Sequence, residues 1–394
     1  MKQGWEIKKL GEVCELSAGG DVPKDNFSEI KTEKYQIPIY ANGEKNDGFY
    51  GFTSIAKVAK PSITVSARGT IGYSVKRLEA FFPIVRLIVV IPINLKELNL
   101  DYLDYAIRKI DFKHSGSSIP QLTVPMIRDY EIPLPSLPEQ QRIVSILDEA
   151  FAAIAKAKAN AEQNLKNAKE LFESYLQWVF ENKGEGWEEK KLINVCELKP
   201  QKKEARDKLS ETDLVTFLPM EDLGVLNKEI VGVKERQFKD VAGSYTYFAN
   251  NDVLLAKITP CFENGKIGIA RNLINGVGFG SSEYIVFRTQ GSIEPEYLYY
   301  FLSRNKIREE GRKYMSGAVG HKRVSKDWIE NYLISFPKSL KTQQTIVRKL
   351  DALSTETKKL EAIYQQKIND LEELKKSVLQ KAFSGELKTA KVLV

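Results

Sequence analysis

Two long stretches of the chain carry apolar residues at alternating steps of three and four. Neither 139–183 nor 338–384 contains a Gly or a Pro, although the rest of the chain is dense in both. The repeating positions of the first stretch are Leu147, Ala150, Ile154, Ala157, Ala161, Ala168, Leu171, Tyr175 and Trp178. Those of the second are Ile346, Leu350, Leu353, Thr357, Leu360, Tyr364, Leu371, Leu374 and Val378. A period near 3.5 over several heptads predicts two long helices in a coiled coil.

The two predicted seams differ in side-chain size. The first contains four Ala, whereas the second is rich in Leu, Ile and Tyr. Small residues that face large ones favour an internal antiparallel pair over separate intermolecular coiled coils. Pro138 and Pro337 precede the two stretches, and we expect extended chain to give way to helix there.

The remainder of the chain lacks this long helical repeat of apolar residues. Runs of β-prone residues bounded by turns occur at 62–75, 82–91, 251–258 and 282–288. Each half then shows a short helical pattern, at 100–110 and at 295–311, before a Ser-Gly loop. This order is typical of α+β domains. We therefore predict a globular domain at 1–137, a helix at 138–182, a second globular domain at 183–340, and a second helix with a C-terminal tail at 341–394.

Two segments from the first half of the chain recur in the second half. WEIKKLGEVCEL at 5–16 returns as WEEKKLINVCEL at 187–198, and QQRIVSILD at 140–148 returns as QQTIVRKLD at 343–351. Between these matches the two halves differ freely. The predicted fold class is therefore α+β, with two globular domains joined by two long antiparallel coiled-coil helices and an internal pseudo-two-fold repeat.

Composition narrows the class of protein. The 394 residues are 42% hydrophobic and 28% charged, which suits two or three domains with real cores. The 59 basic residues exceed the 52 acidic ones, a balance that permits a polyanionic partner without requiring one. Three Cys and two His argue against a disulfide scaffold or a Cys-rich zinc module. We expect no secretory signal, because the N-terminal residues MKQGWEIKKL have no apolar core. We expect no membrane span, because prolines and Arg86 interrupt the longest apolar stretch, and we predict a cytoplasmic protein.

The sequence lacks the common catalytic motifs. It has no phosphate-binding loop of the GxxxxGK[ST] type, and ENGKIG at 263–268 lacks the first glycine and the hydroxyl. The duplicated Cys14 and Cys196 are expected to be small core residues rather than nucleophiles. We predict no catalytic residues, no metal and no cofactor in this chain, which favours a recognition or scaffold protein.

At this point the chain resembles a known family. GSSIPQLTVPMIRDYEIPLPSLPEQQRIVSILD at 116–148 resembles the boundary between a target-recognition domain and a conserved helix in the specificity (S) subunits of type I restriction-modification systems. WEEKKLINVCEL and the segment LKKSVLQKAFSGEL at 374–387 are similar to the parts that follow. SARGTIGYS, NDVLLAKITPCFENGKIGIA and SSEYIVFRTQ also resemble phrases of those recognition domains. The second boundary departs from the family pattern, because it lacks the Pro-Leu-Pro and Glu-Gln of the first.

The resemblance implies a function and a set of partner molecules. Each recognition domain would read one half of a bipartite, asymmetric target in double-stranded DNA, and the helices would set the spacer and dock two methyltransferase (M) subunits. The M subunits would use S-adenosylmethionine to methylate adenine. Restriction (R) subunits, which use ATP and Mg²⁺, would complete an endonuclease that acts against phage DNA. The chain itself would be non-catalytic.

Candidate DNA-contacting residues are polar side chains on loops, the types that read base edges and phosphates. In the first domain they are Tyr40, Asn42, Lys45, Asn46, Arg68, Thr70, Ser117, Ser118 and Gln121. In the second they are Lys257, Thr259, Glu263, Asn264, Lys266, His321, Lys322 and Arg323. The alternative for each is a solvated turn. The domains carry net charges of only +2 (18 basic, 16 acidic) and +3 (25 basic, 22 acidic), so we expect the chain alone to bind DNA weakly.

Two other functions fit the same pattern. One is the recognition subunit of a related system that cuts on both sides of a split site. The other is a coiled-coil adaptor that binds proteins without DNA specificity, against which the Arg-, Asn- and Lys-bearing loops argue.

The predicted helix pair generates a test of the spacer. A helix of about 45 residues is roughly 65–70 Å long, and domains packed near its ends would read half-sites about one DNA turn, roughly 34–36 Å, apart. Deleting or adding one heptad within 139–182 is expected to change the number of unread base pairs and to leave both half-sites the same. Methylation mapping of the variant measures this, and an unchanged spacing contradicts the idea.

Overall fold

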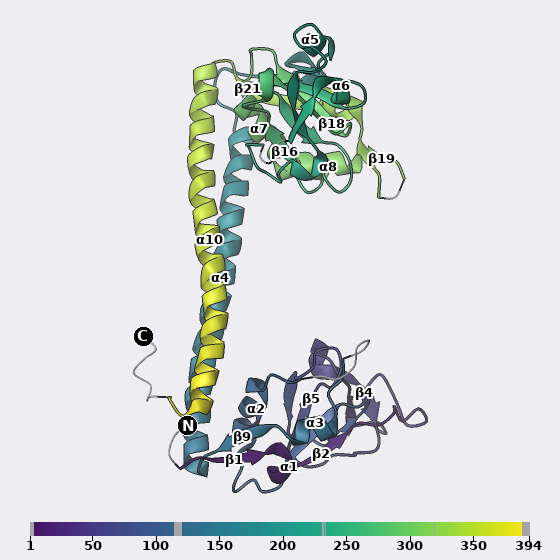
Figure 1. Cartoon of the computed structure of the whole chain (residues 1–394), viewed down its shortest axis with the longest axis vertical. Helices are drawn as coiled ribbons and strands as arrows, with labels where there is room; N and C mark the ends of the chain where they lie inside the picture. Colours follow the sequence, from purple (N-terminus) through teal and green to yellow (C-terminus); the bar gives the residue numbers. More distant parts are fainter. Residues whose placement is uncertain (1–3, 114–119, 231, 233, 319, 388–394) are drawn as a thin grey trace. The chain divides into compact units, whose positions relative to one another are not determined.

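The computed structural model of the chain describes residues 4–113, 120–230, 232, 234–318 and 320–387 (Figure 1). Its contacts divide it into two units, Met1–Glu162 with Gln366–Val394, and Gln163–Gln365. Each unit contains one globular part and a portion of both long helices. We call the globular part of the first unit, 6–134, domain 1, and that of the second, 187–337, domain 2.

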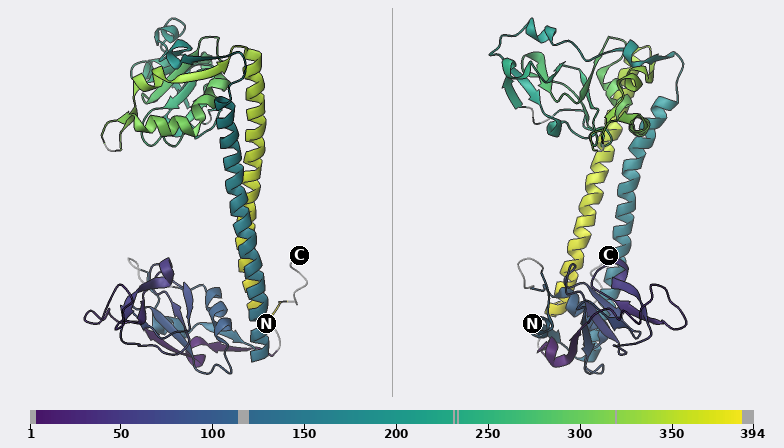
Figure 2. Two further views of the ribbon diagram at one scale, coloured as in Figure 1. Left: turned by 180° about the vertical axis from the view of Figure 1, so that it is seen from behind. Right: turned by 90° about the vertical axis from the view of Figure 1, so that its right-hand side faces the viewer.

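The two long helices are α4 (Leu137–Glu181) and α10 (Leu340–Ser384), each of 45 residues. In the first unit, Leu147 near the start of α4 shares a core with Phe383 at the end of α10. In the second unit, Leu176 near the end of α4 shares a core with Val347 and Leu350 near the start of α10. The beginning of each helix therefore packs on the end of the other, and the predicted antiparallel pair is confirmed (Figure 2).

The seam of this pair differs from the predicted one in its phase. Leu171 and Trp178, placed in the seam by the heptad pattern, are 52% and 55% exposed, while Ala168 and Leu176 are buried. Leu360 and Leu374 of the second predicted seam are exposed too. An undistorted α-helix drifts by about 20° per heptad relative to a 3.5-residue repeat. Over four heptads from Leu147 the buried position consequently moves by about one residue.

Domain 1 contains three sheets. Its elements are β1 (Glu6–Lys9), α1 (Leu10–Val13), β2 (Cys14–Ala18), β3 (Ile37–Tyr40), a 3₁₀ turn η1 (Lys45–Gly48), β4 (Phe49–Thr53), β5 (Ser62–Val65), β6 (Ser74–Arg77), β7 (Phe82–Pro83), β8 (Ile88–Pro92), α2 (Leu100–Lys109), α3 (Val124–Arg128) and β9 (Glu131–Leu134). One sheet has the order β2-β8-β5-β6, a second the order β4-β3-β7, and β1 pairs with β9.

Domain 2 repeats this plan with additions. Its elements are β10 (Trp187–Lys191), η2 (Leu192–Asn194), β11 (Cys196–Leu198), α5 (Lys203–Arg206), β12 (Leu214–Leu218), η3 (Met220–Asp222), β13 (Lys234–Gln237), α6 (Phe238–Val241), β14 (Thr246–Ala249), β15 (Val253–Ala256), β16 (Ile267–Ile269), η4 (Ile274–Gly276), β17 (Val277–Gly280), β18 (Tyr284–Thr289), α7 (Pro295–Ser303), α8 (Asn305–Lys313), β19 (Met315–Ser316), β20 (Arg323–Val324), α9 (Lys326–Asn331) and β21 (Leu333–Pro337). The order β11-β18-β15-β16 matches that of the first sheet in domain 1, and both sheets are wholly antiparallel. The predicted internal repeat is thus a repeat of topology.

Three local predictions need correction. The β-run at 82–91 is broken, because Val85 and Arg86 have φ angles of 52° and 61° and turn the chain between β7 and β8. The helical pattern at 295–311 forms two helices, since Arg304 between them is extended. Pro138 does not precede the helix but lies in its first turn, where its missing N–H leaves no bond unmade.

The first glutamine of each QQ pair joins a long helix to its domain. The Gln140 amide donates to the carbonyls of Glu97 and Pro135, both at 2.8 Å, and its oxygen accepts from Asn99 N at 2.9 Å. Gln343 makes the same three bonds in domain 2, with Ser292 O at 2.9 Å, Pro337 O at 2.8 Å and Glu294 N at 2.9 Å. Both side chains are fully buried. The repeated Gln-Gln pair therefore marks the place where each long helix is hydrogen-bonded to its globular domain, and we call this connection the joint.

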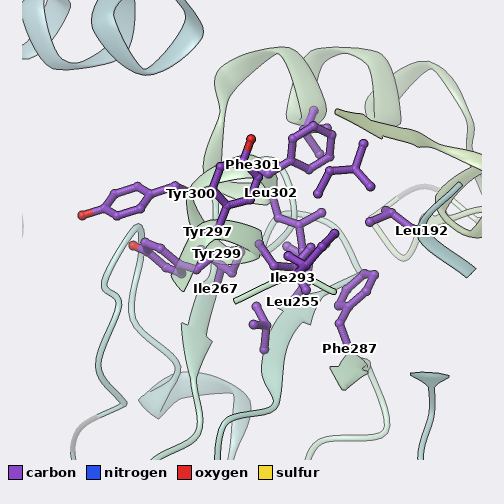
Figure 3. Packing of buried hydrophobic residues seen from close by; sticks show 14 of the residues in the cluster. Leu192, Leu255, Ile267, Phe287, Ile293, Tyr297, Tyr299, Tyr300, Phe301 and Leu302 are labelled. Carbon is purple, nitrogen blue, oxygen red and sulfur yellow. The ribbon is translucent and has the colours of Figure 1, made fainter. Parts of the chain in front are cut away.

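Tyrosines on α2 and α7 reinforce this joint. The Tyr102 hydroxyl donates to Pro133 O at 2.7 Å in β9, and the Tyr297 hydroxyl donates to Ser335 O at 2.9 Å in β21. One turn later, Tyr105 donates to Asp148 and Tyr300 donates to Asp351, the last residues of the two repeated QQ segments. Figure 3 shows the α7 side chains of domain 2 gathered with Leu255 and Ile267 of the sheet.

In the part of the chain that is described, no helix is long and apolar enough to cross a bilayer.

The joint predicts a large difference between two neighbouring glutamines. Gln140→Ala removes three buried hydrogen bonds and leaves the Asn99 amide without its acceptor, so we expect domain 1 to lose about 2–4 kcal/mol of stability. Gln141→Ala, at an exposed position one residue later, is expected to cost less than about 0.5 kcal/mol. Hydrogen exchange of the α2 amides measures both, and equal protection in the two variants would refute the role given to Gln140.

Candidate nucleic-acid interface

In domain 1, Asn42 joins three loops, two of which carry predicted site residues. Its Nδ2 donates to Val85 O at 2.6 Å, and its Oδ1 accepts from Ala67 N at 2.7 Å. The neighbouring Gly43 N donates to Ser66 Oγ at 3.1 Å. The loops at 41–48, 66–72 and 84–87 are thereby fixed side by side. Asn42 is half-buried and both ends of its amide are used inside the domain, so it positions this surface.

Two guanidinium groups converge on one amide oxygen at this surface. Arg68 donates to Gln121 Oε1 from Nε at 3.2 Å and from Nη2 at 2.8 Å, and Arg86 donates to the same oxygen from Nη1 at 3.3 Å. Within the described residues neither arginine makes an ion pair. A guanidinium has five N–H donors, so both retain capacity for a phosphate or a base edge. The pair combines a predicted residue, Arg68, with Arg86, which was not predicted.

The other predicted residues of domain 1 divide by exposure. Lys45, Asn46 and Thr70 are exposed on turns. Tyr40 is instead buried under the Arg77 guanidinium, 3.5 Å from its ring centre, and its hydroxyl donates to Glu79 Oε1 at 2.9 Å. Burial raises the pKa of Tyr40, and the residue is unsuited to base contact. Ser117 and Ser118 lie outside the described residues.

In domain 2, the two predicted groups of site residues lie next to each other. Thr259 N donates to Lys322 O at 2.9 Å, and Val324 N donates to Lys257 O at 2.9 Å. Residues 257–259 thus pair with 322–324, although more than sixty positions separate them in the sequence. The spacing of the motifs gave no sign of this contact.

Several of these side chains are engaged within the domain. Arg323 holds both oxygens of Glu283, at 2.9 and 2.7 Å, and this bond lowers the pKa of Glu283. Lys266 Nζ donates to Met220 O at 2.7 Å, and Thr259 Oγ1 donates to Glu263 Oε1 at 3.1 Å.

Lys257 Nζ donates to Ser282 O at 2.9 Å, and burial lowers its pKa. Asn264, His321 and Lys322 are exposed. Together with Arg323, whose guanidinium is bound to Glu283, these are the predicted residues of domain 2 that are exposed.

Sequence reasoning missed two cationic features. Arg86 was placed within the β-prone run at 82–91, yet an arginine in an otherwise apolar run was a signal for a break. The run KPQKKEAR at 199–206 follows the duplicated Cys-Glu-Leu and lines a cleft described below. A comparison of the two repeats just beyond their matching segments would have found it.

Nothing in the described residues suggests a metal centre, because no group of three His, Cys, Asp or Glu side chains could hold an ion there. Cys14 and Cys196 are both in cores, and burial raises the pKa of each thiol to about 12. Their prediction as core residues is confirmed.

Two globular domains with the same joint and unlike cationic loops define a two-domain scaffold protein. The family described as the type I restriction modification DNA specificity domain matches residues 2–166 and 184–373, and the chain belongs to that family. The predicted family is thus confirmed. Its members are specificity subunits, the non-catalytic components of type I restriction-modification systems.

Individual relatives agree with this membership. A putative type I specificity subunit of Mycoplasma pneumoniae is 36% identical over 173 residues, which are 44% of this chain and 51% of that protein. The match spans about half the length of that protein and of a second putative type I specificity subunit of the same organism, 51% and 49%.

Solved structures share the fold. One, from a study of complex assembly and conformational transition in the type I restriction-modification system, has a TM-score of 0.74 at 19% identity and covers 98% of this chain and 99% of its own. The HsdS subunit of Thermoanaerobacter tengcongensis has a TM-score of 0.59 at 20% identity and covers 98% of both chains.

The loop junction at Asn42 can be tested without any ligand. Asn42→Ala leaves Ala67 N and Val85 O without partners, and we expect a loss of about 1–3 kcal/mol and faster exchange of the Ala67 amide. Lys45→Ala, an exposed neighbour, should change neither. Exchange at Ala67 that matches the unsubstituted protein would show that the loops do not depend on Asn42.

Proposed function

We propose that this chain is the DNA sequence-recognition subunit of a type I restriction-modification complex. Domain 1 (within 1–137) and domain 2 (within 183–340) each read one half of a bipartite, asymmetric target. The helices at 138–182 and in 341–394 set the spacer between the half-sites. Family membership supports DNA recognition, and the observation that carries the bipartite reading is one repeated framework with unlike loops.

The loops supply the chemistry for reading DNA. In domain 1, Arg68 and Arg86 meet at Gln121 without carboxylate partners among the described residues, beside the exposed Thr70 and Lys45. Arginine is the side chain most often used for bidentate contact with guanine, and it also binds phosphate. In domain 2, Asn264, His321 and Lys322 are exposed on the paired segments. Because these two sets differ in composition, we infer two different half-sites.

The helices supply surfaces for partner proteins. The apolar side chains left out of the seam on α4, Leu171 and Trp178, lie exposed in the second unit. A spacing of seven residues places both on one face of the helix, and larger exposed apolar patches mark interaction sites. We infer that each end of the helix pair docks one M subunit, which brings S-adenosylmethionine, and that R subunits with ATP and Mg²⁺ join through the M subunits. The complex would act in the cytoplasm.

The proposal predicts a split methylation mark whose halves change independently. In cells that express this chain with its M subunits, the genome should carry methyladenine in one bipartite motif, and cells without the chain should lack it. Thr70→Ala with Arg86→Asn should alter one half of the motif only. Asn264→Ala with Lys322→Ala should alter the other half only, so each pair of substitutions is the control for the other.

Long-read methylation mapping provides the measurement. A mark that does not depend on this chain would reject the proposal and favour a protein-binding adaptor. A motif whose two halves change together would reject the assignment of one half-site to each domain.

A further inference from the structure

Domain 2 contains a cleft with a volume of about 790 Å³ whose charged lining is entirely basic. It lies among the segment after β11, the start of β14, the start of β18 and the residues around α9. Six cations line it: Lys199, Lys202, Lys203, Arg206, Lys257 and Lys326. Of the described residues in the lining, none is an Asp or a Glu. Such a cleft concentrates positive potential and attracts anions.

Two carboxylates beside the cleft are held by arginines that do not line it. Glu204, in the same short helix as Lys203 and Arg206, accepts from Arg288 Nη1 at 2.6 Å and from the Tyr247 hydroxyl at 3.1 Å. Glu283, near Lys257, is held by Arg323. Two of the six cleft cations also have carboxylate partners, since Lys257 lies 3.9 Å from Glu283 and Lys326 lies 3.3 Å from Glu330. The cleft cations that make no ion pair among the described residues are Lys199, Lys202, Lys203 and Arg206.

The cations also repel one another. Burial, with further contributions from the charges of Arg206 and Lys199, lowers the pKa of Lys202. The ammonium of Lys202 donates to Ala242 O at 3.2 Å and to Gly243 O, which fixes it at the wall of the cleft. An anion that entered the cleft would relieve this repulsion.

Domain 1 has the same framework at this place without the charges. Strand β2 matches β11, but the chain after the shared Cys-Glu-Leu reads SAGGDVPK at 17–24 instead of KPQKKEAR at 199–206. The segment of domain 2 thus carries four cations where the matching segment of domain 1 carries one. In domain 1 the two glycines instead approach the β7–β8 turn, where Val85 N donates to Gly20 O at 2.8 Å and Arg86 N donates to Gly19 O at 3.1 Å. The basic cleft consequently belongs to one domain of the pair.

We propose that this cleft binds the phosphate backbone of double-stranded DNA beside the half-site of domain 2, and that domain 2 supplies the larger share of the salt-dependent affinity. The inference rests on the proposed function. Lys257 and Val324 line the cleft and also belong to the paired segments 257–259 and 322–324 that present the exposed Lys322. A backbone in the cleft would therefore run next to the loop that faces base edges. Cations spread over several segments suit a row of phosphates better than a single small anion.

The salt dependence of DNA binding tests this inference. The test protein is the complete complex with M subunits, and the probe is a duplex with the motif found by methylation mapping. The variant K199Q/K203Q/R206Q removes three cleft cations. The matched control K191Q/K239Q/K313Q removes three lysines of domain 2 that do not line the cleft. The slope of log K against log salt should become shallower by about 2–3 in the cleft variant and by less than about 1 in the control.

The cleft variant should keep its preference for the target DNA sequence. Phosphate contacts position a protein without reading bases, so the ratio of binding to target and scrambled duplexes should stay the same in the cleft variant. An unchanged slope, or an equal change in the control, would overturn the inference. If the unsubstituted complex leaves no split methyladenine mark, the proposed function fails, and the cleft inference fails with it. If the mark is present and the slope does not respond, only the cleft inference fails.

Discussion

The rest of the structure depends on the hydrogen bonds of the buried glutamine at the start of each long helix. A glutamine side chain offers two donors and an acceptor, and at Gln140 and Gln343 both donors and the acceptor meet backbone groups of the adjoining domain. Leaving such groups unpaired in a buried site is costly, so the helix start and the domain are ordered together. The tyrosine bonds to Pro133 and Ser335 extend the same joint into the strand that precedes each helix.

Because the joint bonds each helix to its domain, the position of this framework does not depend on the loops. The matched sheets and joints fix where each domain meets its helix, while the loops at 41–48, 66–72 and 84–87 depend on a contact of their own through Asn42. Loops are free to vary when the elements beneath them are fixed independently. The same arrangement explains why the two halves of the sequence match at their ends and differ in their middles.

The sequence predicted the parts of the fold that depend on period and punctuation. Such signals predicted the two long helices, their antiparallel pairing and the repeated α+β domains. The exposed positions of Leu171 and Trp178 did not follow, because a small drift per heptad accumulates and a pattern read at fixed spacing ignores it. Arg86 and Arg304 broke predicted elements through backbone conformations that residue type alone does not dictate.

The candidate interface was predictable as a set of loops but not as a geometry. Asn42, Arg68 and Gln121 come from three segments, and only tertiary contacts bring them together. Tyr40 looked equivalent to its neighbours in sequence but lies beneath Arg77.

Net charge gave the least information. A domain with an excess of three positive charges looks nearly neutral, yet three of its carboxylates are held by Arg288 and Arg323. Six cations line one cleft, and four of them make no ion pair among the described residues. Attraction of a polyanion depends on where unpaired charge collects, within roughly a Debye length of about 8–10 Å, and a sum over the whole domain conceals that distribution.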